Sequence, residues 1–187
     1  MSIEEIASIK SVLKERKTPK DEKLSPRDEM LVDVAYHLGL RVAELCSLKV
    51  SSFVPSENGG TMWVVGKGSK VRGVAVTESL GKRLLSYIRD MGLKSGDPLF
   101  ISQKGDREPL TTSAIYRVLV GAGVKAKIAR PAHPHRFRHS SAAHAVENGA
   151  PIDVVKNTLG HSDISSTGQY LNLKPKKSNA HFLPDIE

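Results

Sequence analysis

The chain has one cysteine, Cys46, among its 187 residues. A single thiol supports neither a disulfide framework nor a zinc site built from cysteines, so we expect Cys46 to be buried and inert. No apolar run approaches the roughly 20 residues that a membrane span needs. The N-terminus also lacks the basic and then apolar layout of a secretory signal. These absences predict a cytoplasmic protein without a membrane partner.

Metal and nucleotide motifs are missing as well. No HExxH helix or cysteine pair accompanies the histidines. The segment Gly66 to Lys67 is not a phosphate-binding loop, because Thr61 occupies the position where that motif requires glycine. Acidic residues near the candidate site are few and scattered, which disfavours a two-metal nuclease. We therefore expect neither a metal nor a nucleotide cofactor.

The composition is that of one compact globular domain with a basic surface. Hydrophobic residues make up 39% and charged residues 26% of the chain, and its length suits a single core. The formal net charge is +8 and the pI is about 9.6. Clustered lysine and arginine gain free energy by releasing counterions from phosphates, so this charge favours a polyanionic partner.

Helix-like periodicity, with glycine, proline and capping residues at the ends, predicts several helices. They are expected at 3–16, from Pro26 after the capping Ser25 to about Gly39, from about Arg41 through Leu48, at 80–91, from Thr112 or Ser113 through Val120, at 139–148, and from Pro151 to Gly160.

Between Thr61 and Val76 the hydrophobic period changes to two, on both sides of the turn-rich segment 66–70. This pattern predicts a β-hairpin with lysines at its tip. The expected fold is mainly α with a small antiparallel β-sheet, an α+β domain.

Five segments carry residue types suited to phosphate chemistry. They are Gly39 to Leu45, which contains Arg41 and Glu44; Val64 to Lys70, which contains Lys67; His135 to Ser140, which contains Arg138; Leu159 to Ser162, which contains His161; and Thr167 to Tyr170. Taken alone, each suits an ordinary structural role, such as an ion pair, a solvated turn, a helix cap or a core tyrosine. Taken in order, the five resemble the signature of the tyrosine recombinase (integrase) family. The resemblance covers about Ser25 to Tyr170.

The resemblance implies the family's DNA breaking-rejoining catalytic-domain fold and its catalytic set. Arg41 and Arg138 correspond to the arginines that bind the scissile phosphate, with Glu44 in support. Guanidinium stays ionised at any working pH, and its planar fork matches two phosphate oxygens. His161 is expected to donate a further hydrogen bond to the same phosphate.

The remaining chemistry needs a nucleophile, a base and an acid. Tyr170 corresponds to the family's nucleophile, and His135 is our candidate for the base that assists loss of the phenolic proton. The departing 5′ oxygen must gain a proton, which we assign to Lys67, with Lys70 as the alternative. The family's product is a 3′-phosphotyrosine ester. A 5′ hydroxyl from a partner strand can attack that ester, so strand exchange needs no ATP.

The histidine-rich segment permits two registers. His133 with Arg136 also satisfies the His-x-x-Arg pattern, but we prefer His135 with Arg138 because the distance from Arg138 to Leu159 fits the family. Four further basic residues are expected to contact DNA, namely Lys70, Arg72, Arg136 and His139.

The expected organisation is a leading helix and linker at 1–24, the catalytic domain at 25–173, and a tail at 174–187. Family members carry an N-terminal DNA-binding domain, so we expect this chain to be a catalytic fragment of a longer enzyme. The expected partners are double-stranded DNA and further copies of the chain, as a tetramer on DNA. The tail is expected either to dock on a neighbouring protomer or to pack on its own chain.

Two other functions remain open on sequence alone. A type IB topoisomerase shares the tyrosine chemistry, although the spacing from Leu159 to Tyr170 is typical of recombinases. A catalytically silent DNA-binding module with the same fold is the other alternative.

Overall fold

The computed structural model describes residues 1–15, 19–102, 106–160 and 177–186, with only the backbone described at 19–25 and at Lys67. Within these ranges the helices are α1 (Ile3–Lys14), α2 (Pro19–His37), α3 (Val42–Ser47), α4 (Glu78–Asp90), α5 (Thr112–Lys125), α6 (Pro134–Glu147) and α7 (Ile152–Leu159). Short 3-10 turns lie at η1 (Val50–Ser52), η2 (Lys67–Ser69) and η3 (Asn179–Phe182). The strands are β1 (Phe53–Ser56), β2 (Gly59–Val65) and β3 (Val71–Val76). The predicted α+β class is confirmed. No described helix combines the length and apolar character needed to cross a bilayer.

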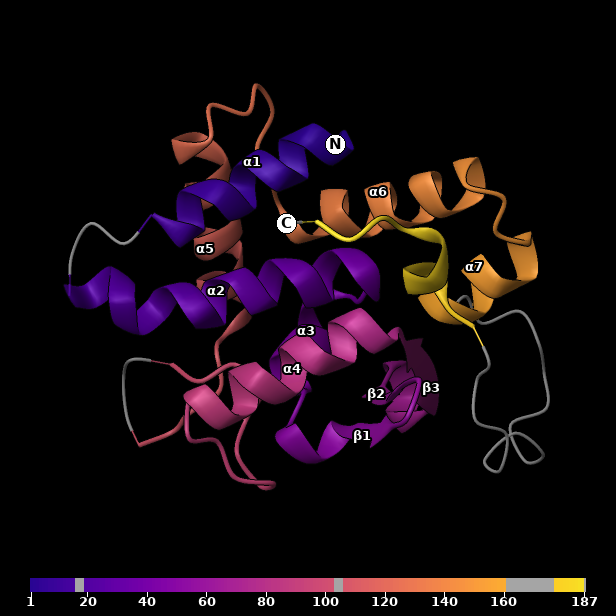
Figure 1. Ribbon diagram of the computed structural model, residues 1–187, viewed down its shortest axis with the longest axis horizontal. Coiled ribbons are helices and arrows are strands. Elements are labelled where there is room, and N and C mark those ends of the chain that lie inside the picture. Colours follow the sequence, from indigo (N-terminus) through magenta and orange to yellow (C-terminus); the bar gives the residue numbers. More distant parts are fainter. Residues whose placement is uncertain (16–18, 103–105, 161–176, 187) are drawn as a thin grey trace.

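Helix α2 is the centre of the core. It is buried around its whole circumference from Met30 to His37, and Leu31, Val32 and Tyr36 have no exposed surface. Helices α1, α4, α5 and α6 all pack against it (Figure 1). Apolar residues occur on every side of this half of the helix, with Asp33 and His37 as buried polar exceptions, which explains why the hydrophobic periodicity of 30–37 is weak.

Helix α2 begins at Pro19, so the linker expected before residue 25 is helical over 19–24, and the predicted boundary between residues 24 and 25 falls inside a helix. The sequence explains the error, because Thr18 to Glu22 (TPKDE) repeats the helix-start pattern of Ser25 to Glu29 (SPRDE). Helix α1 is as predicted and belongs to the same core, with Ile6 and Ile9 fully buried.

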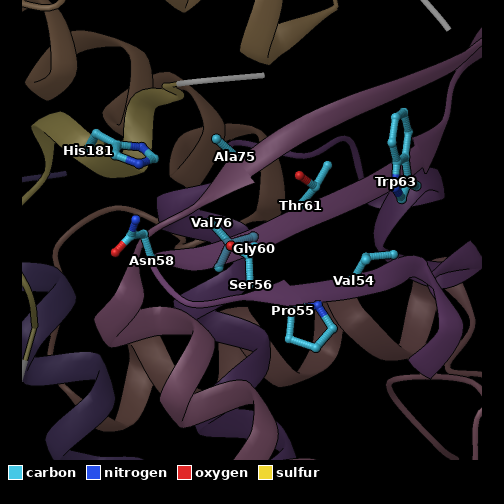
Figure 2. Close-up of a pocket in the computed structure, with 10 residues that line it drawn as sticks. All are labelled: Val54, Pro55, Ser56, Asn58, Gly60, Thr61, Trp63, Ala75, Val76 and His181. Carbon is cyan, nitrogen blue, oxygen red and sulfur yellow. The ribbon is translucent and has the colours of Figure 1, made fainter. Parts of the chain in front are cut away.

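The sheet contains the predicted hairpin and one additional strand. Strands β2 and β3 are antiparallel with Val64 opposite Arg72, and β1 pairs with the other edge of β2. Met62 and Val74 face the core beneath α4, while the opposite face carries a shallow groove that reaches Trp63 and His181 (Figure 2). Of the predicted site residues whose side chains the structure describes, none lines this groove.

Helices α5 and α6 also differ in extent from the prediction. Helix α5 is capped by Thr111 and continues five residues beyond Val120 to Lys125. Helix α6 starts at Pro134 rather than at residue 139, with proline in the first turn, where its missing N–H costs nothing. As a result, the whole His-x-x-Arg segment is helical.

The described end of the chain packs on its own body. Residues 178–186 run along α6 and end between α1 and α2 (Figure 1). Asn179 and Ile186 are buried, the Asn179 amide donates to Ser141 Oγ at 3.2 Å, and Lys10 Nζ donates to the Ile186 carbonyl. Of the two expectations for the tail, packing on its own chain is the one that the structure shows.

Candidate nucleic-acid active site

Arg41 lies at the N-cap position of α3, where α2 ends and the chain reverses. Gly39 makes this reversal with φ +58, and a Cβ there would lie 2.9 Å from Leu159 Cδ2. The Arg41 backbone N–H donates to Glu44 Oε2 at 2.8 Å, and its guanidinium donates to Glu44 Oε1 at 3.2 Å. The Arg41 side chain is 43% exposed. Its guanidinium is therefore both anchored and accessible to a ligand.

Glu44 binds two arginines at once, and its side chain is 3% exposed. Besides the two bonds from Arg41, it accepts a bidentate pair from Arg72, with Nη1 to Oε1 at 2.8 Å and Nη2 to Oε2 at 2.9 Å. Burial alone would raise the pKa of Glu44, but the hydrogen bonds from Arg72 and Arg41 outweigh it, and the pKa lies below its ordinary value.

Arg138 occupies the second turn of α6 and is buried. Its Nη1 donates to the Gly39 carbonyl and its Nη2 to the Leu159 carbonyl, both at 2.7 Å. Burial first, and then the charge of Arg41, lower the pKa of Arg138 to about 10, so the guanidinium stays cationic at neutral pH. It thus lies between the end of α2 and the end of α7.

The C-terminal end of α7 brings the arginines together. Three consecutive carbonyls accept from three different guanidiniums: Thr158 from Arg72 at 3.2 Å, Leu159 from Arg138 at 2.7 Å, and Gly160 from Arg41 at 3.4 Å. The last carbonyls of a helix carry partial negative charge and attract cations. Arg41 and Arg138, predicted from separate motifs, therefore lie in one cluster.

His135 lies in the first turn of α6 and is exposed. Its ring is nearly parallel to that of His133, with centroids 6.4 Å apart, and His133 is parallel to Tyr116 of α5 at 6.3 Å. These three residues and Val42, the neighbour of Arg41, line an open groove. The predicted base therefore lines a groove that includes the sequence neighbour of Arg41, while the three clustered arginines are not among its lining residues.

The other predicted residues vary in position. Lys67 lies in the hairpin tip, where the structure describes only its backbone. Lys70 and His139 are exposed. Arg136 binds within the chain, donating to the Arg130 carbonyl at 2.6 Å and pairing with Glu5 at 3.7 Å. Predictions for His161 and Tyr170 lie outside the described residues.

Arg72 is the residue whose place the sequence interpretation missed. We expected a DNA contact, but three of its donors bind Glu44 and Thr158. The strand pattern could have indicated this position. Alternate residues of a strand face the same side, and Val74 and Val76, which alternate with Arg72, are buried.

The cluster suits an anion. Among the described residues, no three histidine, cysteine, aspartate or glutamate side chains gather as a metal site would need. Guanidinium groups instead offer charge-assisted hydrogen bonds in the geometry that phosphate accepts.

The chain is similar to known proteins across most of its length. The family model described as "Phage integrase family" matches residues 4–177. Tyrosine recombinase XerD of Oceanobacillus iheyensis is 39% identical over 157 residues, which cover 81% of this chain and 52% of the relative. The chain thus spans about half the length of that curated relative.

Solved structures share the fold. XerA recombinase has a TM-score of 0.70 at 30% identity, covering 92% of this chain and 58% of its own. XerH recombinase bound to its difH substrate has a TM-score of 0.69 at 25% identity, and the match covers 87% of this chain and 47% of the XerH chain. The lambda integrase catalytic core has a TM-score of 0.65 at 19% identity, and the match covers 86% of this chain and 94% of the lambda integrase chain. With its arginine cluster in place and the family model spanning nearly all of it, the chain belongs to the phage integrase family.

Proposed function

We propose that this chain is the catalytic domain of a site-specific DNA recombinase. Tyr170 attacks a backbone phosphate to form a 3′-phosphotyrosine, and strand exchange and religation follow without metal or ATP. The convergence of Arg41 and Arg138 at the end of α7 is the observation that carries the proposal. Sequence similarity to XerD along 81% of the chain supports it.

The arginine cluster supplies the electrostatics of the reaction. Attack on a phosphodiester accumulates charge on the nonbridging oxygens, and fixed cations stabilise that charge without reorganising. Arg138 is held by two carbonyls and Arg41 by Glu44, so both guanidiniums are oriented before DNA binds. Arg41 is the more exposed of the two and can reach an incoming phosphate directly.

The remaining roles follow from the proposed chemistry. His135 acts as the base toward Tyr170, from a groove that it lines together with Val42, the sequence neighbour of Arg41. Lys67 at the hairpin tip protonates the 5′ oxygen, with Lys70 as the alternative. His161, the residue after the Gly160 carbonyl that Arg41 binds, completes the phosphate contacts.

Double-stranded DNA is the proposed partner. XerH, which shares this fold, is bound to its difH substrate in the solved structure. Exchange between two duplexes requires four strands to be cut, so we propose four protomers on DNA. The formal net charge of the chain, +8, favours binding to such a polyanion.

A suicide-duplex experiment tests the proposal. A cognate duplex is selected from random DNA and nicked beside the scissile phosphate, so that the released 5′ end diffuses away and traps the covalent complex. The unsubstituted chain is expected to form an adduct that resists denaturation, and Tyr170→Phe to form none while still binding DNA. Tyr87→Phe, which removes a hydroxyl that donates to the Leu99 carbonyl far from the cluster, is the matched control and retains the adduct.

Each other outcome has a distinct meaning. An adduct that persists in Tyr170→Phe contradicts the assignment of the nucleophile. Relaxation of supercoiled DNA without recombinant products supports a topoisomerase instead. DNA binding with no adduct from the unsubstituted chain indicates a silent binding module.

A further inference from the structure

Arg72 joins three segments that carry different parts of the proposed site. It lies on β3 opposite Val64, directly beside the 66–70 hairpin tip that contains Lys67. Its side chain is only 17% exposed. From this position its guanidinium contacts both the first residues of α3 and the last residues of α7.

The first contact is with Glu44. Two parallel bonds of 2.8 and 2.9 Å form a planar bidentate pair, the arrangement in which arginine fixes a carboxylate most firmly. The same carboxylate holds both the backbone N–H and the guanidinium of Arg41. The position of Arg41 therefore depends on Arg72 through a single shared group.

The second contact is with the end of α7. Arg72 Nε donates to the Thr158 carbonyl at 3.2 Å. The guanidinium also lies directly over Gly160, where a Cβ would come within 3.0 Å of its Cζ and Nε. This close approach fixes the helix end one residue before His161.

We propose that Arg72 is a positioning residue for the cleavage reaction, because it locks the lysine-bearing hairpin, Arg41 and the end of α7 into one arrangement. This inference rests on the proposed function and deepens it. With three of its five N–H donors engaged inside the protein and little exposed surface, Arg72 is poorly placed for the DNA-backbone contact expected from sequence.

The two roles predict different kinetics. A positioning role predicts that Arg72→Gln lowers the cleavage rate at saturating DNA, on the order of 100-fold if the groups shift by about 1 Å. Under this role, the affinity of Arg72→Gln for DNA and the salt dependence of that affinity are expected to equal those of the unsubstituted chain. A phosphate contact predicts the reverse, namely weaker binding with a salt slope smaller by about 1 and an unchanged rate at saturation.

The experiment measures single-turnover cleavage of the suicide duplex and DNA affinity at several salt concentrations, for Arg72→Gln and Arg72→Lys. Lysine keeps the charge but cannot make the bidentate pair, so an intermediate rate is expected. Arg89→Gln is the matched control, because Arg89 is exposed on α4 and its side-chain partners among the described residues are the neighbouring Ser86 and Asp90. If Arg72→Gln does not fold, Arg72→Lys decides between the two roles.

Amide hydrogen exchange provides a test that needs no activity. The Arg41 amide, bonded to Glu44, is expected to exchange faster in both Arg72 variants and not in Arg89→Gln. Absence of any adduct from the unsubstituted chain refutes the proposed function but leaves this test in force. An unchanged Arg41 amide, or an unchanged cleavage rate at saturation, overturns the positioning role.

Discussion

At the scale of single residues, the Glu44 carboxylate has all of its acceptor positions in use. Each oxygen accepts two hydrogen bonds, and the donors among the described residues are Arg41 and Arg72. A carboxylate offers about four lone-pair directions, so protonation of Glu44 must displace at least one donor. The group is therefore expected to link stability to pH.

We predict that Glu44→Gln destabilises the fold at neutral pH by about 3 kcal/mol, because it breaks a buried pair and leaves guanidinium charge uncompensated. The folded-state pKa of Glu44 is below its ordinary value, so its contribution is fully present above about pH 4.5. It is lost as the pH falls through the lower folded-state value.

The measurement is urea unfolding of both proteins from pH 7 to pH 3. The difference between their free energies of unfolding should become smaller as the pH drops below 4.5, because Glu44 becomes protonated whereas glutamine does not titrate. A difference that stays constant over this range contradicts the role given to the carboxylate.

At the scale of secondary-structure elements, the ends of several helices could be predicted from glycine. Gly39, Gly92 and Gly160 all have positive φ, and each follows the end of a helix closely. The hairpin was equally predictable, because its alternation continues on both sides of a turn-rich segment. Local patterns of this kind need no knowledge of the tertiary structure.

Elements whose limits depend on tertiary packing were not predictable. We expected α5 to stop at Val120, but the helix continues through Gly121 and Gly123. Gly123 is buried and packs against Ala132, where a Cβ would lie 2.7 Å from the alanine Cβ. This glycine permits close packing rather than ending a helix, a distinction that no local pattern contains.

These two glycines give a matched pair of substitutions. Gly121→Ala has open space around its Cβ and should stabilise the protein by about 0.5–1 kcal/mol through helix propensity. Gly123→Ala gains the same propensity but overpacks the contact with Ala132, at a cost of about 1–3 kcal/mol. Thermal unfolding should therefore show Tm changes of opposite sign. A rise in Tm for both variants would show that the α5 contact is looser than the structure indicates.

At the scale of the whole molecule, the site is assembled from segments far apart in the sequence: Gly39 and Arg138 are 99 residues apart, and Arg41 and Gly160 are 119 residues apart. Gly39, Arg41 and Glu44 precede the sheet, whereas Arg138 and the end of α7 follow it. The described end of the chain, 178–186, closes over α6 and reaches α1 and α2, which fixes these segments against one core (Figure 1).

The sequence motifs predicted that Arg41 and Arg138 act on one phosphate, and in the structure both guanidiniums donate to the end of α7, at Gly160 and Leu159. They could not predict that carbonyls 158–160 would hold the arginines, because backbone acceptors have no residue signature. Arg72 was assigned to DNA for a related reason, since a basic residue beside a hairpin tip is as suited to a phosphate as to a buried carboxylate. Only the tertiary structure shows that Glu44 lies opposite it.

Mapping the covalent adduct tests the central claim most directly. The complex trapped on the suicide duplex is digested with a protease, and mass spectrometry identifies the residue and the DNA end that are joined. The account predicts a phosphate ester between Tyr170 and a DNA 3′ end, with a free 5′ hydroxyl on the released strand. An ester on any other residue, or a linkage to a 5′ phosphate, contradicts it.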